Sequence, residues 1–160
     1  MRYHLIDRIL SVEPGKTLRA SKQLTLGEEY LADHFPGFPV MPGVLMLQAL
    51  VESASWLVRI TKEFDPSVLV LREAKSVKYG TFFAPGSRMN VTVDLAGESD
   101  GKFTFKGKGE VNGQSTVSAS YTLGGYNLRD KNPAWAGRDI ELVKALRSHC
   151  DWLRVERPEA

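Results

Sequence analysis

The stretch from Val44 to Arg59 most restricts the fold, because its apolar residues cover nearly the whole circumference of a helix. It follows Pro42-Gly43 and contains neither proline nor glycine. The apolar positions are Val44, Leu45, Leu47, Leu50, Val51, Ala54, Leu57 and Val58. The stretch is shorter than the roughly 20 residues needed to cross a bilayer. We therefore expect a core helix enclosed by other elements, and no membrane span.

After Asp65-Pro66 the apolar period changes from helical to alternating, which is typical of strands. Four alternating segments follow: Ser67 to Val77, Met89 to Leu95, Phe103 to Phe105 and Val117 to Tyr121. Asp100-Gly101 and Asn112-Gly113 lie between consecutive segments, where a two-residue turn requires positive φ. Together with an opening hairpin from Leu5 to Leu10 and Leu18 to Leu26, the pattern predicts an α+β fold. An antiparallel sheet of five or six strands would surround one central helix.

The last part of the chain has a different pattern. Residues 126 to 138 show no period and are interpreted as a linker, after which Asp139 can cap the N-terminus of a helix. The apolar stripe of that helix contains Ile140, Val143, Leu146, Cys150 and Leu153. We therefore expect one domain over residues 1–125, followed over residues 126–160 by a linker and a C-terminal helix that packs on the core or on a partner.

Composition excludes several classes of protein. A net charge of +2 is too small to indicate nucleic-acid binding. The single cysteine, Cys150, excludes an intrachain disulfide and a cysteine-based zinc site, and it favours a reducing compartment. The opening residues MRYHLIDRIL lack the apolar region of a signal peptide. We expect a cytoplasmic protein.

A candidate site surrounds the start of the core helix. His34 precedes Phe35-Pro36-Gly37, where proline and glycine restrict the backbone and can hold the imidazole in place. Pro42-Gly43 begins the helix, where free backbone N–H groups favour negative charge and glycine allows a ligand to approach. A base and a site for a polarised carbonyl oxygen therefore lie within a short segment.

The core helix also has one polar stripe. Gln48, Glu52 and Ser55 are spaced by four and then three residues, so they share a helix face. This stripe either meets water or lines the same site.

The segment HFPGFPVMPGVLMLQAL resembles the signature of the FabZ-type 3-hydroxyacyl-[acyl-carrier-protein] dehydratases of bacterial fatty-acid synthesis. The resemblance covers about residues 2 to 124. Its further segments are Leu5 to Ile9 with Glu13 to Lys16, Phe83 to Gly86, and Gly109 to Leu123.

The resemblance implies a hot-dog fold, in which an antiparallel sheet wraps one long helix, assembled as a dimer or as a trimer of dimers. It implies that His34 removes the α-proton of a 3-hydroxyacyl thioester on acyl carrier protein, while the N–H of Gly43 polarises the thioester carbonyl. Phe35 and Pro42 would contact the substrate. The family's proton donor is a glutamate fourteen residues after the histidine, contributed by the partner chain, and this sequence has Gln48 there.

Gln48 changes the expected chemistry, because a carboxamide can orient a hydroxyl but has no proton to give near neutral pH. General acid catalysis typically contributes about 10²–10⁴-fold in rate, so its loss would weaken a dehydratase severely. In one alternative, Glu52 or Asp33 replaces the acid. In another, a mixed dimer supplies the glutamate from a different chain. In a third, the protein is a non-catalytic acyl-thioester-binding subunit, or a thioesterase that uses Glu52.

The sequence indicates no cofactor and no metal. It has no glycine loop that would hold a phosphate, and its three histidines, His4, His34 and His149, are not at ligand spacing. The prediction is a 3-hydroxyacyl-carrier dehydratase with altered acid chemistry, in fatty-acid or related lipid or polyketide synthesis.

Overall fold

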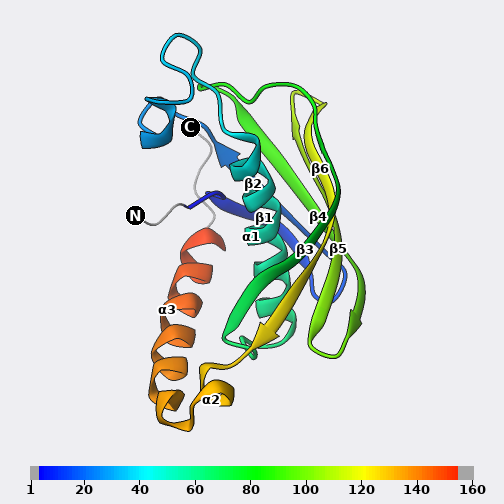
Figure 1. The fold of residues 1–160 in the computed structure, drawn as a ribbon, viewed down its shortest axis with the longest axis vertical. Helices are drawn as coiled ribbons and strands as arrows, with labels where there is room; N and C mark the ends of the chain where they lie inside the picture. Colours follow the sequence, from blue (N-terminus) through cyan, green and yellow to red (C-terminus); the bar gives the residue numbers. More distant parts are fainter. Residues whose placement is uncertain (1–3, 155–160) are drawn as a thin grey trace.

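A six-stranded antiparallel sheet curves around one long helix in this computed structural model, which describes residues 4–154 (Figure 1). The strands are β1 (Arg8–Glu13), β2 (Thr17–Gln23), β3 (Val68–Tyr79), β4 (Arg88–Ser99), β5 (Lys102–Val111) and β6 (Gln114–Tyr126). Their order in the sheet is β1-β2-β4-β5-β6-β3. The enclosed helix is α1 (Gly43–Thr61). The predicted α+β architecture is confirmed, including the opening hairpin of β1 and β2.

The turns predicted from the sequence join the long strands. Asp100 and Gly101 have φ values of 50° and 69°, and Asn112 and Gly113 have values of 51° and 78°. Both residues of each two-residue turn therefore lie in the left-handed region that a type I′ turn requires. These turns set the register of β4 with β5 and of β5 with β6.

The concave face of the sheet buries most of α1. Buried residues continue through its second half from Ser53 to Val58. By length and composition alone α1 could cross a membrane, but more than half of it is enclosed by the rest of the chain. The hydroxyl of Tyr121, on β6, donates a 2.9 Å hydrogen bond to the carbonyl oxygen of Leu50 and so ties the sheet to the helix. Burial raises the pKa of this phenol far above its ordinary value.

The segment expected as a linker contains a single helical turn, α2 (Leu128–Lys131), and a 3₁₀ turn, η2 (Pro133–Trp135). The C-terminal helix α3 (Ala136–Arg154) follows and lies beside α1, on the side away from the sheet (Figure 1). Cys150 and Leu153 on its apolar stripe are buried, as predicted, but Ile140 is 71% exposed. Residues 1–3 and 155–160, at the ends of the two expected segments, lie outside the described residues.

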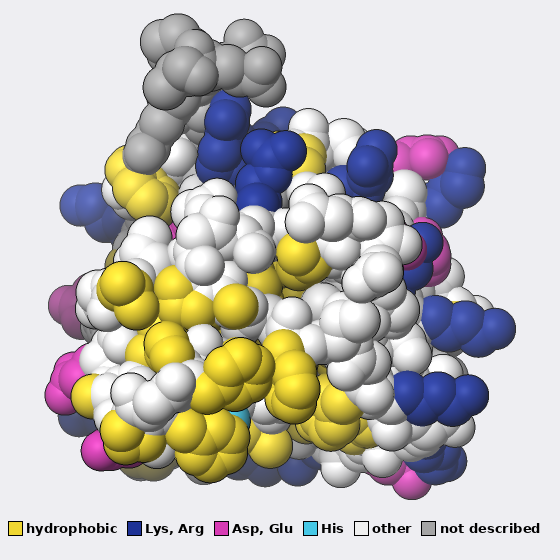
Figure 2. Space-filling view, turned by 90° about the horizontal axis from the view of Figure 1, so that it is seen from above, with side chains coloured by type: hydrophobic (Ala, Val, Ile, Leu, Met, Phe, Trp, Pro, Cys, Tyr) yellow, Lys and Arg dark blue, Asp and Glu magenta, His cyan; other side chains and the backbone are white. Residues whose placement is uncertain are grey.

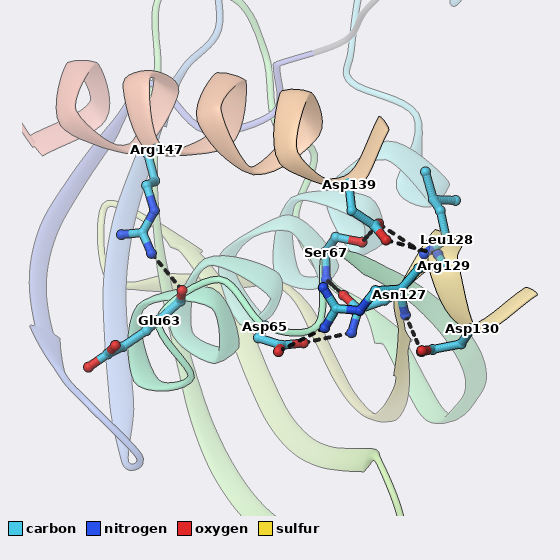
Figure 3. Close-up of polar contacts among 9 residues, drawn as sticks. All are labelled: Glu63, Asp65, Ser67, Asn127, Leu128, Arg129, Asp130, Asp139 and Arg147. Atoms are coloured by element: carbon cyan, nitrogen blue, oxygen red, sulfur yellow. Dashed lines mark hydrogen bonds and ion pairs between the residues drawn. The ribbon is translucent and has the colours of Figure 1, made fainter. Parts of the chain in front are cut away.

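Asp139 does not cap its own helix, which was the expectation, because α3 already begins at Ala136. Its carboxylate instead accepts hydrogen bonds from the Ser67 hydroxyl and from the backbone N–H groups of Leu128 and Arg129 (Figure 3). Burial alone would raise the pKa of Asp139, but these hydrogen bonds outweigh it and lower that pKa. Asp139 therefore joins α3, α2 and the start of β3.

Candidate active site

The loop that carries His34 is held at both of its ends. The backbone N–H of Val40 donates to the carbonyl oxygen of His34 at 3.0 Å. Between them, Phe35 and Phe38 exchange two backbone hydrogen bonds of 3.0 and 3.2 Å, which close a tight turn around Pro36-Gly37. Val40 is buried, so the loop is anchored in the core while Phe35 and Phe38 are exposed.

The imidazole of His34 is oriented by a second contact with the same residue. Its Nδ1 lies 3.0 Å from the carbonyl oxygen of Val40. Because a carbonyl oxygen only accepts hydrogen bonds, Nδ1 must carry the hydrogen. A neutral imidazole in this tautomer has its lone pair on Nε2, which is the atom available to act as a base.

The first turn of α1 provides hydrogen-bond donors beside this loop that have no partner among residues 4–154. The first helical N–H groups that find an acceptor are those of Leu45 and Met46, which both donate to the carbonyl oxygen of Pro42 at 2.9 and 3.2 Å. The N–H groups of Gly43 and Val44 come before these bonds and form the positive end of the helix dipole. They can receive an oxygen atom that develops negative charge.

Gly43 also packs closely against a neighbouring aromatic ring, which a larger residue would have to displace. A Cβ atom at this position would lie 2.9 Å from Cε1 of Tyr79, closer than van der Waals contact allows. Tyr79 ends β3, so the ring brings the edge strand against the start of the helix. The backbone N–H of Met41 donates to the carbonyl oxygen of Phe83 at 2.9 Å. This hydrogen bond holds the segment that leads into α1.

Exposed apolar side chains surround the loop and the helix start. Phe35, Phe38, Val44 and Phe82 are between 51% and 69% exposed, and the rings of Phe38 and Phe82 meet edge to face with centroids 5.3 Å apart. Figure 2 shows hydrophobic side chains gathered over this end of the molecule. We call these four residues the apolar patch. Contiguous exposed apolar surface of this kind marks a protein interface or a binding groove.

The three residues of the polar stripe predicted on α1 lie in three different environments. Gln48 is exposed, whereas Ser55 is buried and donates to the carbonyl oxygen of Val51 at 2.8 Å. Glu52 is half-buried, and its Oε2 accepts a 2.9 Å hydrogen bond from the N–H of Leu5. Burial raises the pKa of Glu52 despite this hydrogen bond. The stripe was expected either to meet water or to line the site, and Ser55 does neither, because it is buried and hydrogen-bonded within its own helix.

His4 and His149 lie together, although they are not at ligand spacing in the sequence. The side chains of His4, Glu52 and His149 offer metal-ligating atoms that are all within 4.8 Å of one another. The absence of ligand spacing in the sequence therefore did not prevent the fold from bringing this pair together. The apolar periodicity of α3 predicts that this helix packs on the core. It does not predict which residue of α1 His149 contacts.

A groove of about 440 Å³ separates α3 from the connection between α1 and β3. Its lining includes Phe64, Ile140 and Val143, and the Arg147 guanidinium lies over the Phe64 ring at 4.4 Å. Arg147 also donates to the carbonyl oxygen of Glu63 at 2.7 Å (Figure 3). Sequence reasoning missed this groove because distant segments form it.

Comparison with known proteins agrees with the geometry. The family model of the FabA-like domain matches residues 1–120. The chain is 34% identical over 133 residues to the 3-hydroxyacyl-[acyl-carrier-protein] dehydratase FabZ of Janthinobacterium sp., covering 81% of this chain and 85% of that protein. It is 36% identical over 121 residues to FabZ of Albidiferax ferrireducens, covering 74% and 81%.

Solved structures share the fold at lower identity. The dehydratase heterocomplex ApeI:P from Xenorhabdus doucetiae superposes with a TM-score of 0.66 at 15% identity, covering 83% of this chain and 90% of that one. Smu.793 from Streptococcus mutans, bound to acetyl CoA, gives a TM-score of 0.60 at 15% identity, covering 79% and 95%. The antiparallel sheet wrapped around α1 is therefore the hot-dog fold.

Proposed function

The chain belongs to the FabA-like family, and from that premise we propose that it is a 3-hydroxyacyl-[acyl-carrier-protein] dehydratase. The reaction removes water from a 3-hydroxyacyl thioester and leaves a trans-2-enoyl thioester. The observation that carries the proposal is the hydrogen bond from Nδ1 of His34 to Val40, which leaves Nε2 free as a base beside the first turn of α1. The reaction is redox-neutral, so the proposal invokes no cofactor.

The base and the oxyanion donor have separate tasks in the proposed mechanism. Nε2 of His34 takes the proton from the α-carbon, and the electrons of that bond move toward the thioester carbonyl. The N–H of Gly43 donates to the carbonyl oxygen as its negative charge grows, with the helix dipole in support. Phe35 and Pro42 contact the acyl chain on either side.

The departing hydroxyl must receive a proton, and the amide of Gln48 cannot supply one. The imidazolium formed on His34 is the nearest acid that the first step creates. We assign both transfers to His34: the α-proton moves to the hydroxyl, the C–O bond breaks, and water leaves as the double bond forms. The carboxamide of Gln48 orients the hydroxyl by hydrogen bonding.

Two carboxylates remain as substitutes for the missing acid. Asp33 is exposed and adjacent to His34 in the chain. Glu52 is hydrogen-bonded to the N-terminal segment through Leu5, which makes it the weaker candidate. For the same reason Glu52 gives little support to the thioesterase alternative, which would need it at the thioester carbonyl.

We further propose a homodimer that forms through β3. This twelve-residue strand pairs with β6 on one side and is the edge of the sheet on the other. A long unpaired edge is a template for another strand, and the apolar patch lies at the same end as Tyr79, where the strand finishes. In such a dimer we expect Gln48 of the partner subunit to face His34, as the resemblance to the dehydratases implies. Three such dimers could associate further into a trimer of dimers.

The absence of a carboxylate at Gln48 is also the specific observation that favours a second candidate. A mixed dimer, in which another chain supplies the glutamate, would make this protein a subunit that binds the acyl thioester and provides the base alone. This candidate predicts acyl-thioester binding without turnover by the purified chain.

The proposed substrate carrier is acyl carrier protein in the cytoplasm. Arg72, Lys75 and Lys78 are exposed along β3, and Lys75 forms an exposed ion pair with Glu73 at 3.1 Å. Exposed cations of this kind favour docking of an acidic carrier that weakens as salt increases.

The test replaces His34 and follows two reactions. Wild-type protein should form enoyl thioester from a 3-hydroxyacyl carrier thioester without releasing free thiol, and should exchange the α-protons of a saturated acyl thioester in heavy water. His34→Ala should lose both activities while it keeps its fold. His4→Gln is the matched control, because this histidine is remote in sequence from the loop, and it should keep both. Undiminished exchange in folded His34→Ala protein would contradict the assignment of the base, and thiol release would indicate a thioesterase.

A further inference from the structure

We propose that His4, Glu52 and His149 form a binding site for one divalent transition-metal ion of the Zn²⁺ class. Their ligand atoms all lie within 4.8 Å of one another in the fold. Two imidazoles and a carboxylate are a ligand set that zinc favours, and three protein ligands leave one coordination position open. The proposal does not depend on the dehydratase assignment, since neither histidine takes part in the proposed mechanism and Glu52 is only the weaker of its two substitute acids.

The ligands come from three segments that the fold holds together. His4 lies in the segment before β1, and its carbonyl oxygen accepts a 3.1 Å hydrogen bond from the buried ammonium of Lys22. The next residue, Leu5, donates its N–H to Oε2 of Glu52 at 2.9 Å. The first contact ties the His4 backbone to β2, and the second places it beside the middle of α1. The Leu5 N–H also orients the carboxylate, as outer partners of metal ligands commonly do.

His149 is positioned from the other side by aromatic stacking. Its ring lies nearly parallel to Trp56, with centroids 5.4 Å apart, and to His4, with centroids 4.7 Å apart. Its Nε2 is buried and has no hydrogen-bond partner among the described residues. A buried imidazole nitrogen without a partner is costly and requires an explanation. Coordination of a metal ion would satisfy it.

Small movements would complete the coordination. Tetrahedral zinc holds nitrogen and oxygen ligands at about 2.0–2.2 Å, which places ligand atoms roughly 3.3 Å from one another. The most separated pair must therefore approach by up to about 1.5 Å. His4 is exposed and can rotate toward Glu52, whereas His149 is held in the stack.

The charges around the site limit its affinity. The guanidinium of Arg59 lies over the Trp56 ring at 5.2 Å and attracts the carboxylate of Glu52, so it competes with a cation. Lys22 competes less, because it is already paired with Glu28 at 2.6 Å and with Asp7 at 3.4 Å. We therefore expect weaker binding than at a closed zinc site with four protein ligands.

Metal binding would connect α3 to the hot-dog core. His149 belongs to α3, beyond residue 120, where the match to the family model ends. A ligand that binds only the folded state stabilises it in proportion to its concentration over its Kd. The bound ion would therefore stabilise the packing of α3 and of the N-terminal segment on α1.

The experiment uses tag-free, chelator-treated protein and the metal alone as the probe. Calorimetric titration with Zn²⁺ should show one ion per chain, and Co²⁺ should give the visible absorption of a low-symmetry site. His149→Gln and His4→Gln should each weaken binding by more than about 10-fold, since loss of even an outer partner of a metal ligand costs that much. Two matched controls should bind as the wild type does: His34→Ala, which removes the third histidine, and Cys150→Ser, which removes the thiol next to His149.

Thermal unfolding gives a second readout that does not require variants. The midpoint of the wild-type protein should increase on addition of Zn²⁺ and return to its starting value with chelator, whereas His149→Gln should not respond. Absence of saturable one-to-one binding together with an unchanged midpoint in the wild type would overturn the proposal. Equal binding by His149→Gln and the wild type would overturn it as well, and loss of binding in Cys150→Ser would assign the metal to the thiol instead.

Discussion

Replacing Gln48 by glutamate should add a dedicated proton donor to a site in which His34 is proposed to carry out both proton transfers. The two side chains have nearly the same shape, and position 48 is exposed on the second turn of α1. An exposed substitution without special contacts usually changes stability by no more than about 0.5 kcal/mol, so the variant should fold normally. Any change in rate can then be attributed to the new acid.

The expected gain depends on how often the new carboxyl is protonated. General acid catalysis typically contributes about 10²–10⁴-fold, equivalent to roughly 2.7–5.5 kcal/mol of barrier. A fully hydrated glutamate with a pKa of about 4.3 is protonated in only about one molecule in 500 at pH 7, which would cancel most of that gain. Coverage of the apolar patch and position 48 by a partner would raise the pKa of the carboxyl by desolvation. We therefore expect Gln48→Glu to increase dehydration by about 100-fold near neutral pH.

The pH dependence has a definite sign. An acid must be protonated to act, so the ratio of variant to wild-type rates should increase as pH falls through the pKa of the new carboxyl. The assay follows the absorbance of the enoyl thioester formed from a 3-hydroxyacyl carrier thioester. Glu52→Gln is the matched control on the same helix: it keeps an acceptor for the Leu5 N–H, and it should leave the rate unchanged unless Glu52 is already the acid.

An unchanged rate in a folded, dimeric Gln48→Glu protein that binds acyl thioester, at every pH from about 5 to 8, would refute the reasoning about the missing acid. If Glu52→Gln abolished activity instead, Glu52 would be the proton donor. If neither variant formed enoyl thioester while binding persisted, the mixed-dimer candidate would replace the dehydratase proposal.

Three further predictions concern stability and reactivity. Tyr121→Phe should lower the free energy of unfolding by about 1 kcal/mol in urea titrations, because the hydrogen bond to Leu50 is lost; no change would show that the bond contributes nothing. Because the pKa of Asp139 is lowered in the folded state, its contribution to stability is complete above the ordinary carboxyl pKa of 3.8 and is lost as pH falls through the lower folded value. The unfolding midpoint of Asp139→Asn should therefore depend less on pH in that acid range than that of the wild type, and parallel curves would contradict this. Burial raises the pKa of the Cys150 thiol, so it should react with a thiol reagent far more slowly in native than in unfolded protein, and equal rates would be inconsistent with its burial.

Most of the fold follows from patterns that are local in the sequence. The apolar circumference of residues 44–59 requires an enclosed helix wherever the rest of the chain goes, and the structure buries it. Asp100-Gly101 and Asn112-Gly113 determine two turns because few other residue pairs adopt positive φ at both positions. The segment from His34 to Gly43 is equally local, since its hydrogen bonds to Val40 and its helix start lie within ten residues of one another.

The tertiary structure alone decided which distant side chains meet. Periodicity shows that a helix has an apolar face, but it does not show which element covers that face, because that depends on how segments far apart in the chain pack together. For this reason Glu52, which shares a helix face with Gln48 in the sequence, lies against the N-terminal segment and beside His149, 97 positions further along the chain. Asp139 likewise caps a neighbouring turn instead of its own helix, because its donors belong to Ser67 and α2, which only the tertiary structure brings beside it.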